Sequence, residues 1–289
     1  DIGVPQMLLR LRQHHRYAVI EMGMNHVGEI SYLTQLAKPS IALITNAGAA
    51  HIEGLGSIEA VARAKAEIFE GLDQQGTAII NADDSYAPLW RKCAGSRPII
   101  DFGLREKARV SADYSTDPLM STIQLKLPDG METIQLQTPG VHNVYNALAA
   151  AAATTALGIP KESIASGLEC FRGVKGRMQK KLGLHHALLI DDTYNANPES
   201  VRAALAVLAS TKGKKILILG DMGELGQSTV DLHRMIGKEA RKAGLDKLLT
   251  LGELSAYATA EFGKDAQHFN TLDELLNATE SLLADDVTL

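Results

Sequence analysis

The chain has 289 residues, 45% of them hydrophobic, and carries a formal net charge of −5 at pH 7. This length and apolar content allow two domains with separate cores, while the scattered lysines and arginines form no basic tract that would follow a nucleic-acid backbone. The longest apolar stretch, residues 146–159, is shorter than the roughly 20 residues of a membrane-spanning helix. We therefore expect no nucleic-acid partner and no membrane span, and we expect a monomer.

The two cysteines, Cys93 and Cys170, belong to no CxxC motif and no Cys/His cluster. That pattern fits a reducing compartment and argues against structural zinc. We expect a cytoplasmic protein in which both residues are buried thiols. Residue 1 is Asp, no signal-peptide pattern follows it, and the chain stops in a strand-like run, which predicts that both ends are cut.

Apolar runs that end in a polar residue or glycine alternate with helical patterns in the first part of the chain, as is typical of an α/β sheet. The predicted strands are residues 17–23, 41–48 and 77–81. The predicted helices are residues 29–37 and residues 57–72, the second capped by Ser57. Residues 110–138 alternate with period two on both sides of a Pro-Asp-Gly turn, which predicts an antiparallel insertion.

The second part of the chain opens with two predicted helices, at residues 143–157 and 161–171. The basic segment 172–181 has little apolar periodicity, so we place a domain boundary near Gly176. Strand-helix alternation then resumes, with strands at 187–190, 216–219 and 248–251. The predicted fold class is α/β, with a mostly parallel sheet and an antiparallel insertion in residues 1–175 and a smaller Rossmann-like domain in residues 176–289.

Polar residues follow several predicted strands, where ligands of open α/β sheets bind. The first strand contains Glu21, and the second contains Asn46 near its end and is followed by His51. A carboxylate and an imidazole beside a nucleotide can hold Mg²⁺, which takes one or two protein ligands and completes its shell with phosphate oxygens and water. Glu21 with His51 is the candidate pair. The alternative is a Glu bonded to backbone amides and a solvated loop His.

Lys65 lies in the middle of the apolar stripe of the predicted helix 57–72. Burying an unpaired ammonium is costly. In one interpretation the stem packs on the core and the head reaches water, Glu67 or Glu70. In the other, the site that Lys65 faces changes or neutralises its charge.

Two weaker signals lie further along the chain. Arg177 suits a phosphate oxygen because its guanidinium is always charged, although a solvated linker residue is the alternative. Residues 220–226 match a dinucleotide fingerprint only loosely, since their glycines are spaced GxxGxxG. Asp221 and Glu224 in this loop can face a cationic amine substrate or cap the loop. The phosphate-binding motif GxxxxGK[ST] does not occur in the chain.

Several motifs together resemble one family. They are Glu21-Met22-Gly23-Met24-Asn25, Thr45-Asn46 with His51, Ala64-Lys65-Ala66-Glu67-Ile68-Phe69, Pro139-Gly140 with His142-Asn143 and Asn146, Gly176-Arg177, Asp192 with Tyr194-Asn195-Ala196-Asn197, and Gly220-Asp221-Met222 with Glu224-Leu225-Gly226. Their order and spacing are similar to those of the Mur ligase family over essentially the whole chain. The segments 194–197 and 220–222 are most similar to the members that add D-alanyl-D-alanine to UDP-N-acetylmuramoyl-tripeptide in peptidoglycan precursor synthesis.

The resemblance implies an ATP-dependent amide-bond ligase with a central ATP-binding domain in residues 1–175. The γ-phosphoryl of ATP would move to the terminal carboxylate of the peptide, and the amine of D-alanyl-D-alanine would attack the acyl phosphate. By matching position, the ligands of two Mg²⁺ ions would be Glu21, His51 and a carbamylated Lys65. The nucleotide contacts would be Asn46, Asn146 at adenine, Arg177 at the phosphates, Asp192 at the ribose, and Tyr194. The substrate contacts would be Asn195 and Asn197, and the catalytic residues Lys65, His51 and Arg177.

Parts of the family pattern are missing from this sequence. The domain that holds the UDP-sugar, the P-loop expected upstream of residue 1 and a lysine-containing strand expected after Leu289 are absent, so we expect this chain alone to be inactive and to bind ATP weakly. Three alternatives stay open: another Mur-type ligase or a folylpolyglutamate synthetase, a dinucleotide-dependent protein built on residues 220–226, and a nucleotide-binding relative without catalysis. The segment 194–197 speaks against the first.

Overall fold

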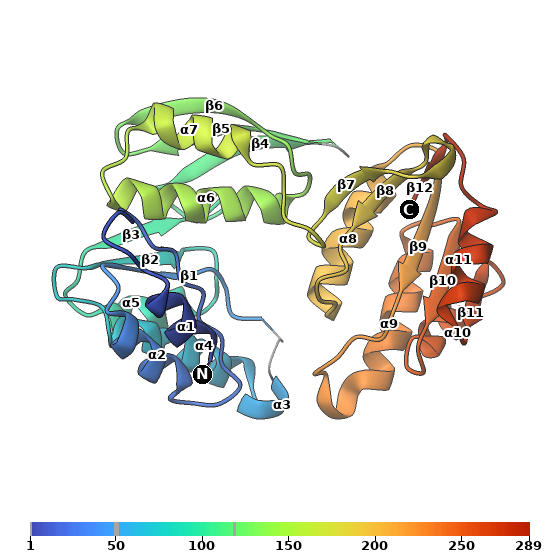
Figure 1. Cartoon of the computed structure of the whole chain (residues 1–289), viewed down its shortest axis with the longest axis horizontal. Helices are drawn as coiled ribbons and strands as arrows, with labels where there is room; N and C mark the ends of the chain where they lie inside the picture. The colour runs from blue at the N-terminus through green and yellow to red at the C-terminus, as the bar shows by residue number, and fades with distance from the viewer. Residues whose placement is uncertain (1, 49–51, 118–119) are drawn as a thin grey trace. The chain divides into compact units, whose positions relative to one another are not determined.

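The computed structural model describes residues 2–48, 52–117 and 120–289 and divides into two compact units (Figure 1). The first unit comprises Asp1–Asp113, Ile123–Ile134 and Tyr145–Leu168, and the second comprises Tyr114–Thr122, Gln135–Val144 and Glu169–Leu289. Parallel strands and covering helices occur in both, which confirms the predicted α/β class. Among the described residues, no helix combines the length and the apolar character that a membrane crossing requires.

The first unit contains a parallel sheet in the order β1-β2-β3, formed by β1 (Ile41–Ile44), β2 (Thr77–Asn81) and β3 (Ile99–Phe102). The helical segments in this part are α1 (Gly3–Leu9), α2 (Glu29–Ala37), α3 (Ile52–Leu55), α4 (Ile58–Ala66), the 3-10 turn η1 (Glu67–Phe69) and α5 (Ala87–Ala94). Helices α4 and α5 share one core with β1 and β2. Trp90 in this core is fully buried and donates its indole N–H to the Ala62 carbonyl at 3.0 Å, so this large side chain leaves no polar atom unpaired.

Residues 17–23, predicted as a strand, form no regular secondary structure, so that prediction is wrong. Val19 is 97% exposed, and Glu21 is exposed as well. The prediction rested on an apolar run, but a strand also needs a neighbour that satisfies its backbone groups. In the described part of the chain β1 pairs with β2 alone, and residues 17–23 join no ladder.

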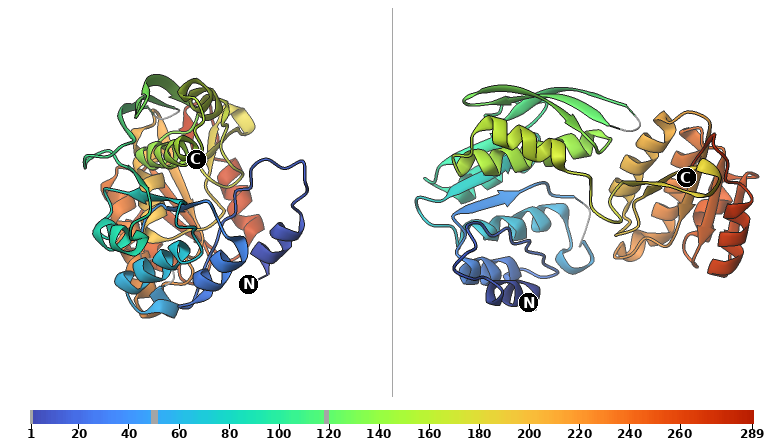
Figure 2. Two further views of the ribbon diagram at one scale, coloured as in Figure 1. Left: turned by 90° about the vertical axis from the view of Figure 1, so that its left-hand side faces the viewer. Right: turned by 45° about the horizontal axis from the view of Figure 1, so that its top comes forward.

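The predicted insertion is a three-stranded sheet formed by β4 (Ser111–Thr116), β5 (Ser121–Leu127) and β6 (Gly130–Leu136). Only two residues join β5 to β6, and a connection that short requires antiparallel strands. Helices α6 (Val141–Ala156) and α7 (Lys161–Cys170) follow, and Figure 2 shows them beside these strands. An ion pair between Lys161 and Glu132 ties α7 to β6.

The second unit contains a sheet in the order β11-β10-β9-β12-β8-β7. Its strands are β7 (Gln179–Leu182), β8 (Leu188–Asp191), β9 (Lys214–Leu219), β10 (Lys247–Leu251), β11 (Ala266–Phe269) and β12 (Val287–Thr288). Strand β7 is antiparallel to β8, and the other neighbours are parallel. Its helical segments are η2 (Leu184–His186), α8 (Pro198–Ser210), η3 (Gly226–Ser228), α9 (Thr229–Lys242), α10 (Ala256–Phe262) and α11 (Leu272–Glu280).

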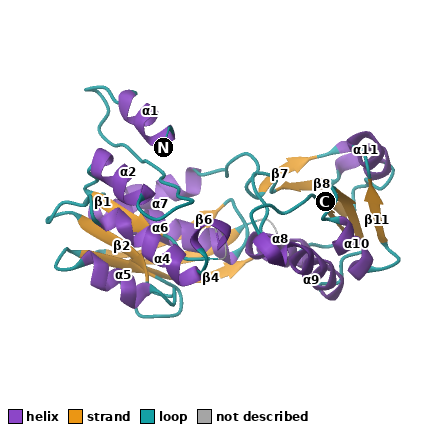
Figure 3. Cartoon of the chain, turned by 90° about the horizontal axis from the view of Figure 1, so that it is seen from below, coloured by secondary structure: helices purple, strands orange, loops and turns teal. Residues whose placement is uncertain are grey.

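Alternate residues of β9 belong to two different cores, as expected for a strand covered on both faces. Leu219 packs with residues of α8, α9 and α10, whereas Ile216 packs with α11 and with the segment that leads to β12. Figure 3 shows α8 and α9 on one side of these strands and α11 on the other. The second unit is therefore doubly wound, as the strand-helix alternation predicted.

Both cysteines are exposed free thiols, so the expectation that they are buried is wrong. Cys93 lies on α5, whose buried positions are Ala87, Trp90 and Ala94. These three residues share one face of the helix, and Cys93 falls outside that face. Cys170 is the last residue of α7, beyond the buried positions Ile164 and Ala165 of that helix.

Candidate active site

Lys65 lies near the end of α4, and its amine forms a hydrogen bond within the first unit. Ser57 caps the helix by accepting from the Ala60 amide at 3.1 Å, as predicted, although α4 ends at Ala66 and gives way to a 3-10 turn. Lys65 is half-buried between neighbours that are buried, and its Nζ donates to the Asn46 carbonyl at 2.7 Å. A charged donor on a carbonyl oxygen is one of the stronger hydrogen bonds. The structure thus joins two predicted site residues, Lys65 and Asn46, at the carboxyl end of β1.

The turn after β2 holds the same strand end from the other side. Asn81, which is 8% exposed, donates its side-chain amide to the Thr45 carbonyl at 2.9 Å. The Asp84 carboxylate accepts from the Ala47 amide at 2.9 Å and from the Tyr86 amide at 2.8 Å. The sequence interpretation did not include this turn in the site.

Asp83, in the same turn, has a side chain that is only 2% exposed and is fully engaged. Its carboxylate accepts from the backbone amides of residues 104–106 at 2.6 to 3.2 Å and from the Tyr145 hydroxyl at 2.7 Å. Burial alone would raise the pKa of Asp83, but these hydrogen bonds outweigh burial and hold it below its ordinary value. Burial and the Asp83 carboxylate raise the pKa of Tyr145 to about 12.

The predicted metal ligands are only partly placed. Glu21 is exposed in the irregular segment before α2, and His51 lies outside the described residues. Within the described ranges, no three His, Cys, Asp or Glu side chains come together in a way that could hold a metal ion. The pairing of Glu21 with His51 therefore stays a prediction. Asn146 is exposed on α6, directly after Tyr145.

Three predicted residues of the second unit lie together at the end of β8. The Arg177 guanidinium lies over the Tyr194 ring, 4.2 Å from its centroid, and the Tyr194 amide donates to the Gly176 carbonyl at 3.0 Å. The Met178 amide donates to the Asp192 carboxylate at 3.0 Å. Backbone and side-chain contacts between residues 176–178 and 192–194 thus bring Arg177, Asp192 and Tyr194 to one place.

His142 also belongs to this group, although the sequence interpretation gave it no role. Burial raises the pKa of Asp192, while the Met178 amide, His142 and Arg177 lower it in part. Burial lowers the pKa of His142, and the nearby Asp192 charge opposes that shift. The only sequence signal for His142 was its position at the start of the alanine-rich helix. No local pattern connects it to Asp192, which follows 50 positions later.

The group formed by Arg177, Asp192 and Tyr194 depends on a glycine at position 176. Its φ is +73°, and a Cβ there would lie 3.1 Å from the Tyr194 nitrogen. Gly176→Ala is expected to lower the free energy of unfolding by about 1–2 kcal/mol, because an L-residue is strained at positive φ. Urea unfolding measures this, with Gly167→Ala as the control. Gly167 lies within α7 with nothing near its Cβ position, so alanine there should stabilise by about 0.5–1 kcal/mol. Equal losses in both variants would contradict this explanation.

The two predicted substrate contacts differ in their surroundings. Asn195 is exposed. Asn197 forms a capping box at the start of α8, where its side chain accepts from the Ser200 amide at 2.9 Å and its own amide donates to the Ser200 hydroxyl at 3.0 Å. Such caps contribute about 1 kcal/mol to helix stability, so Asn197 has a structural role whatever it binds.

The loop 220–226 is held by internal hydrogen bonds. The Asp221 carboxylate accepts from the amides of residues 254 and 255 at 3.1 and 2.7 Å, which fits the loop-capping alternative. The Met222 amide donates to Nε2 of the fully buried His233 at 2.9 Å. Because Nε2 accepts, Nδ1 carries the hydrogen that bonds the Thr229 carbonyl at 2.7 Å.

This bonding makes His233→Ala a stability test of the loop. The buried Met222 amide would lose its acceptor, and we expect the free energy of unfolding to fall by about 2–3 kcal/mol. His233→Asn, which offers both a donor and an acceptor, should recover part of the loss. If urea unfolding gives the same stability for wild type and His233→Ala, the loop does not depend on this contact.

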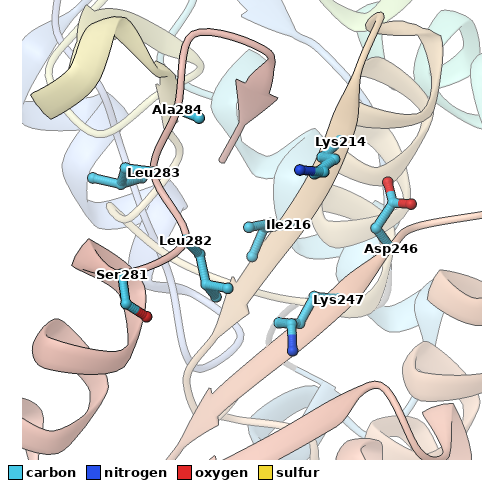
Figure 4. Close-up of a pocket in the computed structure, with 8 residues that line it drawn as sticks. All are labelled: Lys214, Ile216, Asp246, Lys247, Ser281, Leu282, Leu283 and Ala284. Atoms are coloured by element: carbon cyan, nitrogen blue, oxygen red, sulfur yellow. The ribbon is translucent and has the colours of Figure 1, made fainter.

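A pocket of about 380 Å³ lies elsewhere in the second unit. Figure 4 shows Lys214, Asp246 and Lys247 around Ile216, with the segment 281–284 opposite. These residues are at the amino ends of β9 and β10. Since ligands of such sheets bind at the carboxyl ends, this pocket is not the candidate site.

Comparison with known proteins connects the two groups of residues to one family. The family model described as "Mur ligase middle domain" matches residues 1–154, and the one described as "Mur ligase, glutamate ligase domain" matches residues 176–289. The chain belongs to the Mur ligase family. Mur ligases of known sequence are similar over almost all of it: the UDP-N-acetylmuramoyl-tripeptide--D-alanyl-D-alanine ligase of Escherichia coli is 39% identical over 99% of this chain and 63% of its own length.

Two further Mur ligases support the same placement. The Haemophilus influenzae enzyme with the same name is 40% identical over 96% of this chain and 60% of its own length. The crystal structure of MurF from Acinetobacter baumannii superposes with a TM-score of 0.90 and 40% identity, covering 97% of this chain and 61% of that one. The chain thus spans about three fifths of the length of these relatives. MurF from Thermotoga maritima, solved in complex with ADP, shares the fold with a TM-score of 0.82 at 22% identity.

Proposed function

We propose that this chain takes part in an ATP-dependent ligation that adds D-alanyl-D-alanine to UDP-N-acetylmuramoyl-tripeptide through an acyl phosphate. The observation that carries the proposal is the 39–40% identity, over 96–99% of the chain, to two enzymes with that name. We place the reaction in the cytoplasm, in a monomer with a domain boundary near Gly176.

In the first unit we assign Asn46 and Asn146 to the nucleotide and Glu21, His51 and Lys65 to two Mg²⁺ ions. The position of Lys65 is compatible with a carbamate, because the modified Nζ keeps one N–H that can still donate to the Asn46 carbonyl. Mg²⁺ would neutralise the charge that develops on the transferring phosphoryl group. The backbone carbonyls of Asn46 and Thr45 accept from Lys65 and Asn81, which supports a defined backbone at this strand end.

In the second unit we assign Arg177 to the phosphates, Asp192 to the ribose, and Tyr194 to the nucleotide. The stacking of Arg177 on Tyr194 restricts the guanidinium while leaving its N–H groups free to bind phosphate oxygens. Asn195 and Asn197 are assigned to the substrate. Phosphoryl transfer depends mainly on such positioning and on charge neutralisation, with little covalent chemistry for the protein.

The proposal is tested with a chimera, defined as the Escherichia coli relative in which this chain replaces the matching residues. The chimera is incubated with ATP, one acceptor and one amine at a time, the acceptor being either UDP-N-acetylmuramoyl-tripeptide or a folate, and the mass of the product is measured by mass spectrometry. D-alanyl-D-alanine should give the pentapeptide with one phosphate released per amide. Product with a single amino acid in place of the dipeptide would favour another Mur-type ligase, and glutamate addition to a folate would favour a folylpolyglutamate synthetase.

The dinucleotide alternative depends on the loop 220–226, in which the Asp221 carboxylate already accepts from two amides and the Met222 amide donates to His233. We expect no thermal shift of this chain with NAD or NADP. A shift that saturates at micromolar NAD would revive that alternative.

A further inference from the structure

Three side chains hold three consecutive residues, 45–47, where β1 has ended. The Asn81 side chain donates to the carbonyl of residue 45, and Lys65 donates to the carbonyl of residue 46. The Asp84 carboxylate accepts from the amide of residue 47. We propose that Asn81 and Asp84 are positioning residues for the nucleotide site, because they fix the backbone that carries Asn46. The inference rests on the proposed function, in which Asn46 contacts the nucleotide.

The physical reason is that residues 45–47 lie beyond the last ladder residue of β1, Ile44. Thr45 and Asn46 are exposed, so packing does little to restrain them. Fixing the backbone of one residue costs about 1–2 kcal/mol of conformational entropy. The hydrogen bonds of Asn81 and Asp84 order this backbone during folding. Ligand binding then loses no free energy to ordering it.

The same turn also reaches the second predicted nucleotide contact of this unit. Asp83 accepts from the Tyr145 hydroxyl at 2.7 Å, and Tyr145 directly precedes Asn146 on α6. Within the turn, the Asn81 side chain accepts from the Asp83 amide at 3.0 Å. One short turn, anchored at the end of β2, therefore restrains both Asn46 and Asn146.

Two isosteric variants test the proposal. Asn81→Asp keeps an oxygen for the Asp83 amide but turns a carboxylate oxygen toward the Thr45 carbonyl, and Asp84→Asn leaves one of its two amide donors without an acceptor. The matched control is Asp101→Asn on β3. The Asp101 carboxylate also serves two donors, the Arg91 guanidinium at 2.6 Å and the Arg109 amide at 2.7 Å, and touches neither residues 45–47 nor the turn in these bonds.

The readouts are the dissociation constant of Mg·ADP by titration calorimetry of the chimera, its KM for ATP and its kcat, and urea unfolding. Asn81→Asp and Asp84→Asn should each weaken Mg·ADP binding about tenfold, the effect of losing one or two net hydrogen bonds, and should raise KM more than they lower kcat. Asp101→Asn should change the affinity for Mg·ADP less than about twofold, even if its free energy of unfolding falls as much as that of the two turn variants. Hydrogen exchange should accelerate in Asp84→Asn at the amide left without an acceptor, Ala47 or Tyr86, and at neither amide in Asp101→Asn.

The outcomes distinguish the positioning role of Asn81 and Asp84 from the proposed function. If wild type binds Mg·ADP and both turn variants bind it equally well, or if Asp101→Asn weakens binding as much as they do, the positioning role is wrong and the proposed function stands. If the wild-type chimera binds no adenine nucleotide, the proposed function fails and the positioning role fails with it.

Discussion

Replacing Lys65 with arginine is expected to lower the turnover of the chimera by about 100-fold or more, the effect of removing one catalytic charge-stabilising group. Arginine can still donate to the Asn46 carbonyl, which Lys65 Nζ reaches at 2.7 Å, so the free energy of unfolding should change by less than about 1 kcal/mol. Arginine does not take up CO₂ as a lysine amine does. A large loss of turnover in a stable variant would therefore separate the chemical role of Lys65 from its structural role.

The modification itself has independent readouts. A neutral lysine amine adds to CO₂, forming an N–C bond and releasing one proton. Native mass spectrometry of the chimera with nucleotide should therefore show the mass of one added CO₂, which should be missing in Lys65→Arg. Removing CO₂ from the buffer should lower wild-type turnover, and bicarbonate should restore it. Wild-type turnover that is independent of CO₂, together with an active Lys65→Arg variant, would contradict the carbamate.

Replacing Asp83 with alanine is expected to give the largest loss of stability in the first unit, about 2–4 kcal/mol, because a nearly buried carboxylate that accepts from four donors is lost. The donors are the amides of residues 104–106 and the Tyr145 hydroxyl. Tyr145→Phe removes only one of these bonds and should cost about 1.5–3 kcal/mol. Urea unfolding of both variants measures the two losses, and Asp83→Ala within about 1 kcal/mol of wild type would contradict the burial described here.

The same carboxylate makes a predictable contribution to the pH dependence of stability. Its folded-state pKa lies below the ordinary value, so its stabilisation is fully present above the unfolded pKa of about 3.9 and is lost as the pH falls through the folded pKa. Between these two values the unfolded chain binds more protons than the folded one. Asp83→Asn should lack this component, and its free energy of unfolding should fall less steeply below pH 4 than that of wild type.

Much of the fold follows from the sequence because its signals are local. Strand β2 and helix α2 end where the apolar periodicity ends, and Ser57 caps α4 as its residue type predicts. Three edge strands, β3, β7 and β11, were not predicted. Strand β7 reads Gln-Lys-Lys-Leu, and strand β11 reads Ala-Gln-His-Phe, so neither shows an apolar run, because edge strands are only half covered. Residues 17–23 show the reverse error, since they have the apolar run and lack the neighbouring strand.

The candidate site was predictable to a smaller extent, because its contacts join residues far apart in the chain. The position of Lys65 on an apolar stripe marked it as unusual, but its hydrogen bond to Asn46 spans 19 residues. Asp83 looks like an ordinary turn residue in the sequence, and its partners follow 21 to 62 positions later. No periodicity encodes such separations, which depend on how the elements pack.

The most direct test of the account follows an oxygen atom through the reaction of the chimera. The tripeptide substrate carries ¹⁸O in its terminal carboxylate, and ATP and D-alanyl-D-alanine are unlabelled. If the carboxylate oxygen attacks the γ-phosphorus and leaves with phosphate as the amide forms, one ¹⁸O appears in each phosphate released. Pentapeptide that accumulates together with unlabelled phosphate would contradict the acyl-phosphate route.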